Sequence, residues 1–130
     1  MVCEVKLDNI MTITVTLLLP QYQVVVLDVD SFDLEESDNC TSDFLTIYEV
    51  YSMNSTEYIR QLAVLCGYFS PFSIHSAFST VIIIFESDGN ATETGFSLEY
   101  ETTYLASKYI AFVCLKIFVI NSFTWNIFLF

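Results

Sequence analysis

Residues 32–48, FDLEESDNCTSDFLTIY, place five carboxylates around one cysteine before the sequence turns abruptly apolar. The five acids are Asp33, Glu35, Glu36, Asp38 and Asp43. Carboxylates crowded into one turn repel each other unless a positive charge lies among them. Asp and Ser also favour turns for conformational reasons of their own. The stretch is therefore either a solvated turn or a site for a cation.

The charge balance of the whole chain limits the partners that such a site could take. The 130 residues carry sixteen acidic and only four basic side chains, a formal net charge of −12. This charge repels phosphate, so it argues against nucleic acids and anionic membrane surfaces as partners. Basic proteins, amines and metal cations remain.

The cysteines and the single histidine favour a binding protein over an enzyme. Cys3, Cys40, Cys66 and Cys114 lack CxxC spacing, and a lone His75 does not complete a Cys/His zinc site. The sequence contains neither a G-x-S-x-G nor an H-E-x-x-H motif. We therefore expect no enzymatic activity.

Three N-glycosylation acceptor motifs point to the secretory route. They are NCT at Asn39, NST at Asn54 and NAT at Asn90, and each lies in a turn-like stretch. Together with an even number of cysteines, they predict an extracellular, disulfide-bonded glycoprotein.

Short β-branched and alternating runs predict strands, with polar turns between them. The predicted strands span residues 12–19, 22–29, 44–51, 57–67, 79–87 and 95–101. In 44–51, Leu45 and Ile47 share one face, and the apolar run 79–87 is expected to be buried on both sides at its centre. This pattern predicts an all-β sandwich.

The last 22 residues, 109–130, break the pattern because they contain one charge, Lys116. Their length suits a membrane-spanning helix. Lys116 and Asn121 are costly in hydrocarbon, and no basic residue follows them to mark a cytoplasmic side. We expect an apolar, helical tail that forms an anchor or an apolar hairpin, the alternative being a segment outside the domain.

Three segments in order resemble a CUB domain. They are FDLEESDNCTSDFLTIY (32–48), LCGYFSPFSIHS (65–76) and VIIIFESDGNATETGFSLEY (81–100), and the likeness covers roughly residues 11–102. The resemblance implies a jelly-roll-like sandwich of two antiparallel sheets in an extracellular protein. It also implies a disulfide between Cys40 and Cys66.

The front of the chain departs from the family pattern. CUB domains begin with a Gly-rich segment and a cysteine pair, followed by C-x-W-x-I, where this chain has NIMTITV (9–15). The first strands therefore look absent, which predicts a truncated domain with an uncovered sheet edge. The predicted organisation is a non-family leader (1–10), a CUB-like domain (11–103) and an apolar tail (104–130), a candidate membrane segment.

The resemblance also addresses the acidic turn, because many CUB domains bind Ca²⁺ there. It implies that Glu35, Asp43 and Asp88 are ligands, and that Asn90 supplies a further oxygen. Ca²⁺ takes six to eight oxygen ligands, which suits carboxylates from separate turns. The remaining acids of the turn are interpreted as solvated charge.

These features predict an extracellular protein–protein recognition module. In calcium-binding CUB domains a lysine of the partner reaches the carboxylates that hold the ion, so we expect a partner with a basic surface. One alternative is an adhesive or structural ectodomain fragment of a membrane-anchored protein. A more distant one is a non-catalytic, substrate-recognition module of a protease.

Overall fold

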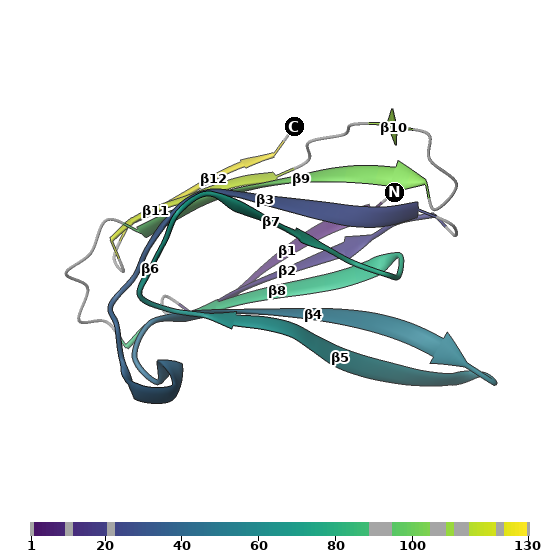
Figure 1. The fold of residues 1–130 in the computed structure, drawn as a ribbon, viewed down its shortest axis with the longest axis horizontal. Coiled ribbons are helices and arrows are strands. Elements are labelled where there is room, and N and C mark those ends of the chain that lie inside the picture. Colours follow the sequence, from purple (N-terminus) through teal and green to yellow (C-terminus); the bar gives the residue numbers. More distant parts are fainter. Residues whose placement is uncertain are drawn as a thin grey trace.

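Two antiparallel β-sheets packed face to face make up the protein (Figure 1). The computed structural model describes residues 2–9, 12–20, 23–88, 95–104, 109–110, 115–121 and 124–129. Within these ranges the chain forms strands and one 3₁₀ turn, η1 (Asp38–Cys40), and no α-helix. The prediction of an all-β sandwich of two antiparallel sheets is confirmed.

The first sheet has five strands in the order β1-β2-β8-β4-β5. They are β1 (Val2–Asn9), β2 (Thr12–Leu18), β8 (Thr80–Glu86), β4 (Phe44–Met53) and β5 (Thr56–Leu65). Burial alternates strictly along β8, as expected of a strand with one face on the core. Ile82 and Ile84 are only half-buried, so the prediction that this run is buried on both sides is wrong. On the outer face Ile82 is flanked by side chains of the adjoining strands, Thr16 and Tyr48, and not by a second sheet.

The second sheet follows the order β12-β11-β9-β3-β6, with β10 also pairing with β9 and β7 with β3. Its strands are β3 (Gln23–Asp33), β6 (Tyr68–Phe69), β7 (Phe72–His75), β9 (Gly95–Tyr104), β10 (Tyr109–Ile110), β11 (Leu115–Asn121) and β12 (Thr124–Leu129). The pairing of β3 with β9 runs from Gln23 opposite Tyr104 to Asp33 opposite Gly95. This pairing forms the centre of the sheet.

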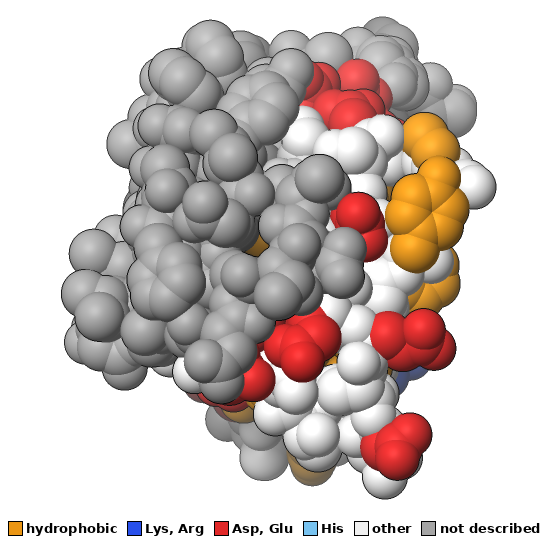
Figure 2. All heavy atoms as spheres, turned by 90° about the vertical axis from the view of Figure 1, so that its left-hand side faces the viewer, with side chains coloured by type: hydrophobic (Ala, Val, Ile, Leu, Met, Phe, Trp, Pro, Cys, Tyr) orange, Lys and Arg blue, Asp and Glu red, His pale blue; other side chains and the backbone are white. Residues whose placement is uncertain are grey.

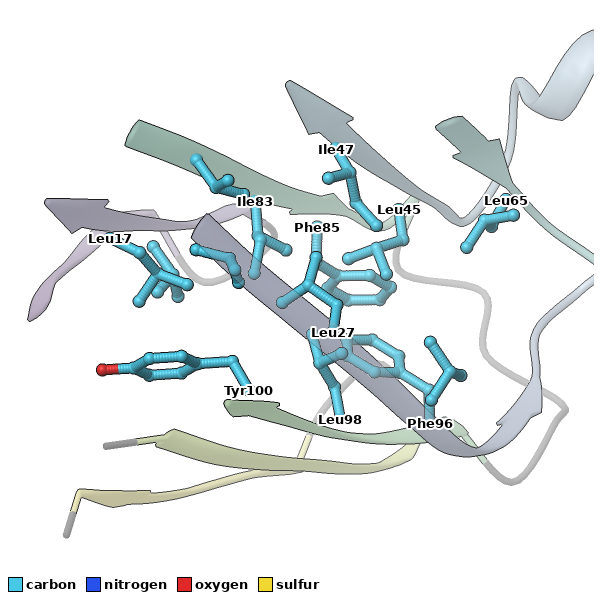
Figure 3. Close-up of a cluster of buried hydrophobic side chains, with 14 of the residues drawn as sticks. Leu17, Leu27, Leu45, Ile47, Leu65, Ile83, Phe85, Phe96, Leu98 and Tyr100 are labelled. Carbon is cyan, nitrogen blue, oxygen red and sulfur yellow. The ribbon is translucent and has the colours of Figure 1, made fainter. Parts of the chain in front are cut away.

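Apolar side chains of both sheets meet between the layers (Figure 3). Leu27, Leu98 and Tyr100 point from the second sheet towards Leu17 and Ile83 of the first. All five are at most 2% exposed. Full burial of one such aliphatic or aromatic side chain contributes about 1.5–3 kcal/mol, so this layer holds the two sheets together.

Two predictions about the ends of the domain are wrong. The apolar tail is not helical where it is described. β11 and β12 pair as an antiparallel hairpin, which is the predicted alternative to an anchor, and β11 pairs with β9. The edge of β2 is covered, because β1 pairs along it from Val2 opposite Leu18 to Asn9 opposite Thr12. β1 lies within the segment that we predicted to be a leader.

The described residues contain no helix long and apolar enough to cross a membrane.

Candidate metal centre

Three acidic side chains from separate parts of the chain meet at one end of the sandwich. β4 and β8 are antiparallel, with Phe44 opposite Glu86, so the start of β4 and the end of β8 coincide. Asp43 immediately precedes β4, Asp88 lies two residues beyond β8, and Glu35 comes from the turn after β3. One carboxylate oxygen of each lies within 4.8 Å of the others. The fold thus brings together the three carboxylates that the resemblance predicted as ligands.

Asp43 is the most buried of the three, with 3% of its surface exposed. Its Oδ1 atom accepts a hydrogen bond from the Ser87 hydroxyl at 3.0 Å and another from the Asp88 backbone N–H at 3.0 Å. Hydrogen bonds to a carboxylate are charge-assisted and strong. They hold the carboxylate of Asp43 in place and tie the turn after β8 to the start of β4.

Glu35 is half-buried and Asp88 is exposed, so the group runs from the interior to the surface. Glu35 makes other interactions, but its buried Oε2 atom accepts no hydrogen bond from the described residues. A buried carboxylate oxygen is stabilised by a donor or by a cation. Hard oxygen donors from three segments, one of them reaching solvent, are suited to Ca²⁺.

The turn that carries Glu35 is fixed to the body of the protein. A disulfide joins Cys40 of η1 to Cys66 beyond β5, with 5.5 Å between their Cα atoms, which confirms the predicted bridge. The Leu34 N–H donates to the Gly67 carbonyl at 2.9 Å. Ser37 Oγ accepts hydrogen bonds of 3.0 and 3.1 Å from the two backbone N–H groups of Thr41 and Ser42. The position of Glu35 relative to the sheets is therefore determined by covalent and hydrogen bonds.

The other residues predicted near the site lie apart from this group or outside the described ranges. Glu36 and Asp38 are exposed, and Asp33 belongs to β3. None of these three is among the grouped acids that the described residues offer to a metal. Asn90, predicted as a further ligand and as a glycan acceptor, lies outside the described residues. Figure 2 shows several acidic side chains on the surface at this end of the molecule.

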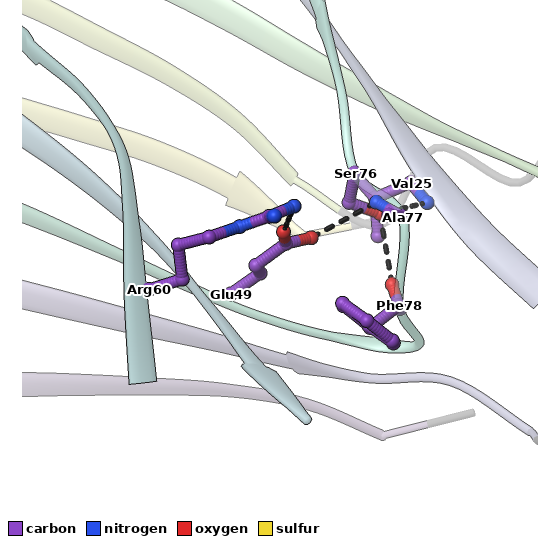
Figure 4. A network of polar contacts seen from close by, with 6 residues as sticks. All are labelled: Val25, Glu49, Arg60, Ser76, Ala77 and Phe78. Atoms are coloured by element: carbon purple, nitrogen blue, oxygen red, sulfur yellow. Dashed lines mark hydrogen bonds and ion pairs between the residues drawn. The ribbon is translucent and has the colours of Figure 1, made fainter. Parts of the chain in front are cut away.

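Sequence reasoning missed Ser87 and Glu49. Ser87 precedes Asp88 and donates to Asp43, a role that the Ser-Asp turn itself could have signalled. Glu49 is fully buried although it lies on a strand with an apolar inner face. It pairs with Arg60 of β5 and accepts the Ala77 N–H at 2.9 Å (Figure 4). Arg60 comes from β5 and Ala77 from the turn before β8, so only the fold reveals this network.

A two-sheet sandwich closed by a disulfide is an architecture that is common among secreted domains. Residues 11–100 match the sequence model of the CUB domain. The chain belongs to the CUB-domain family. CUB domains are in general non-catalytic recognition modules.

Curated relatives share this domain but are much longer. The chain is 31% identical to Ovochymase-2 of Mus musculus over 80 residues, which are 62% of this chain and 12% of that protein. It is 31% identical to Procollagen C-endopeptidase enhancer 1 of Homo sapiens over 86 residues, 66% of this chain and 18% of that protein. It is 29% identical to Cubilin of Rattus norvegicus over 79 residues, 61% and 2% of the two chains. The chain therefore spans less than a fifth of each of these relatives.

A solved structure shows the same fold. The CUB1-EGF-CUB2 domain of human MASP-1/3 superposes with a TM-score of 0.62 at 22% sequence identity. The likeness covers 78% of this chain and 39% of that one. The CUB-like arrangement of the two sheets is thus shown independently of the sequence match.

Proposed function

We propose that this chain is an extracellular recognition module that binds a basic partner protein through a calcium ion. Glu35, Asp43 and Asp88 would hold the ion, and Asn90 would supply a further oxygen. When bound, the ion neutralises the mutual repulsion of the carboxylates and orders the turns that carry them. The observation that carries the proposal is the meeting of these three carboxylates within 4.8 Å.

A basic partner follows from the charge that remains at the site. Three ionised carboxylates outweigh one divalent ion by one negative charge. An ammonium group of a partner lysine would be attracted to this excess, and the net charge of −12 would steer it there. Exposed Asp88 is the member of the group that such a lysine could approach from solvent.

The extracellular location is part of the same proposal. CUB-domain relatives such as cubilin and procollagen C-endopeptidase enhancer 1 support it. The Cys40–Cys66 disulfide is typical of proteins that fold outside the cytosol. Asn39 and Asn54 are both exposed in turns, which makes them accessible as glycan acceptors, and Asn90 remains a proposed third.

Calcium titration by calorimetry of wild type, Asp88→Ala and Asp38→Ala tests the ion site. Asp88→Ala removes one carboxylate but keeps the backbone N–H that binds Asp43, so the turn stays anchored. We expect it to lose about tenfold or more in calcium affinity, equivalent to about 1.4 kcal/mol. Asp38→Ala removes an exposed acid outside the group and should stay within about twofold.

Equal calcium binding by wild type and Asp88→Ala would show that the three acids are only a solvated turn. Binding of a lysine-rich peptide to the wild type should also require calcium and disappear with chelator. Peptide binding that persists without calcium would show that the module recognises its partner without the ion.

A further inference from the structure

The β4–β5 hairpin ends the first sheet in an exposed edge strand (Figure 1). We propose that two copies of this chain pair antiparallel through their β5 strands, with Ile59 of each copy at the twofold axis. This contact does not involve the acidic end of the molecule. It would join the first sheets of the two copies into one continuous sheet.

β5 presents apolar side chains at an open edge. Every residue from Thr56 to Gln61 is exposed, and β5 is the terminal strand of its sheet. Ile59 is 67% exposed and Tyr58 is 43% exposed. An edge strand has unpaired backbone groups that can accept another strand, so natural proteins usually protect such edges with charge or a bulge. The stretch 56–61 carries only two charges, Glu57 and Arg60, and the guanidinium of Arg60 pairs with Glu49 of β4; the bulge of β5 follows at Leu62.

The hairpin turn determines which backbone groups point outward. Asn54 and Ser55 have φ of 52° and 64°, the left-handed pair of a two-residue type I′ turn. In such a hairpin the residues flanking the turn, Met53 and Thr56, exchange both hydrogen bonds. The N–H and C=O groups of alternate residues then face β4. Those of Glu57, Ile59 and Gln61 face away from the sheet.

A twofold pairing centred on Ile59 matches these outward groups. In one continuous sheet, the two side chains that lie opposite each other must be on the same face. Successive residues of a strand alternate between the faces, so the sequence numbers of two opposed β5 residues must differ by an even number. Ile59 then meets Ile59 of the second copy, and Glu57 meets Gln61. Tyr58 lies opposite Arg60, so no like charges face each other there; the Arg60 guanidinium stays paired with Glu49 of β4 and the Tyr58 ring stays stacked on Tyr51.

Neighbouring registers fit less well. Centred on Tyr58, the pairing would place Glu57 opposite apolar Ile59. Centred on Arg60, it would place two arginines opposite each other, and like charges opposite one another destabilise a sheet. Leu62 is the extra residue of a β-bulge, so the regular part of the outward edge, Glu57–Gln61, is symmetric about Ile59.

Charge complementarity also favours a second copy as the occupant. The chain has a net charge of −12, but β5 contains one acid and one base and is formally neutral. Two acidic chains can therefore approach along β5 without like charges facing each other. Asn54 lies in the turn, outside the paired segment Glu57–Gln61.

Sedimentation of deglycosylated protein over a range of concentrations tests the pairing, with Gln61→Lys and Gln61→Glu as variants. Residue 61 of each copy lies opposite Glu57 of the other, so one dimer contains this contact twice. An opposite-charge pair should tighten association by about 2- to 30-fold and a like-charge pair should weaken it by a similar factor. In the wild type, the amides of Ile59 and Gln61 should gain protection from hydrogen exchange as concentration rises.

Ser70→Lys and Ser70→Glu serve as matched controls because Ser70 is exposed between β6 and β7, on the other sheet. They change the net charge by the same amounts as the two Gln61 variants, and they should change the association constant less than those variants do. Equal shifts at both positions would mean general repulsion and would overturn the proposed register. A mass of one chain at every concentration for wild type and Gln61→Lys would overturn the pairing and leave the edge to a different partner.

Discussion

At the scale of single residues, Glu49 is the least expected side chain in the protein. It is fully buried, whereas its partner Arg60 is half exposed, and Arg60 also lies 5.9 Å from the Phe78 ring centroid. The second carboxylate oxygen of Glu49 accepts the Ala77 N–H. Adjacent Ser76 accepts the Val25 N–H at 2.8 Å and donates to the Phe78 carbonyl (Figure 4). This network joins β4 and β5 to the turn before β8 and to β3.

Replacing Glu49 with Ala should destabilise the fold. The change leaves the Ala77 N–H without its acceptor, whereas Arg60 is half exposed and solvent can hydrate its guanidinium once the carboxylate is gone. We expect a loss of about 1–3 kcal/mol of unfolding free energy, measured by denaturant titration. Glu57→Ala on the neighbouring strand removes an exposed acid and should change it by about 0.5 kcal/mol or less. Similar losses for the two variants would mean that the network contributes little.

At the scale of elements, alternation predicted the strands well where one face is buried. The run 44–51 was expected to place Leu45 and Ile47 on one face, and both are fully buried in β4. The run 109–130 carries no such alternation, and a continuous apolar run does not distinguish a helix from a strand. Its pairing with β9 is a tertiary contact, which explains why the helical prediction was wrong.

The candidate site was predictable only in part, and for a similar reason. Its three acids were found through a family resemblance, because no local pattern links Asp88 to Glu35 across more than fifty residues. The antiparallel register of β4 and β8 is what brings Asp88 beside Asp43. The Ser87 hydroxyl and the Leu34 to Gly67 hydrogen bond depend on the same tertiary arrangement.

The bridge between η1 and the end of β5 makes a testable contribution to stability. Cys40 and Cys66 are 26 residues apart, so the disulfide restricts a loop of that size in the unfolded chain. Replacing both with Ser should lower the unfolding free energy by about 3 kcal/mol. The same variant should bind calcium more weakly, because the turn carrying Glu35 loses its covalent anchor. An unchanged denaturation midpoint would contradict the first expectation and unchanged calorimetry the second.

At the scale of the whole molecule, the protein combines a largely apolar core with an excess of acidic side chains. Among the described residues, nineteen buried hydrophobic side chains form the core, and Tyr100 is one of the largest that are fully buried. It lies on β9 between the layers, where Figure 3 shows it beside Leu27 and Leu98. Burial disfavours the tyrosinate form and raises the pKa of Tyr100 from 10.0 to about 12.

This shift predicts a loss of stability at alkaline pH. Below pH 10 both the folded and the unfolded states keep the phenol proton, so the contribution of Tyr100 is fully present. Between pH 10 and 12 the unfolded chain releases that proton while the folded chain retains it, and the unfolding free energy falls as pH rises. A shift of two pKa units corresponds to about 2–3 kcal/mol.

Denaturant titrations of wild type and Tyr100→Phe from pH 8 to pH 12 measure this loss. The other ionisable groups are common to both proteins, so their contributions cancel in the difference between the two curves. Wild type should lose about 2–3 kcal/mol relative to Tyr100→Phe across this range, because phenylalanine has no proton to release. Curves that stay parallel up to pH 12 would mean that the phenol titrates equally in both states. In that case the interior around β9 would admit solvent at high pH, despite the 1% exposure of Tyr100.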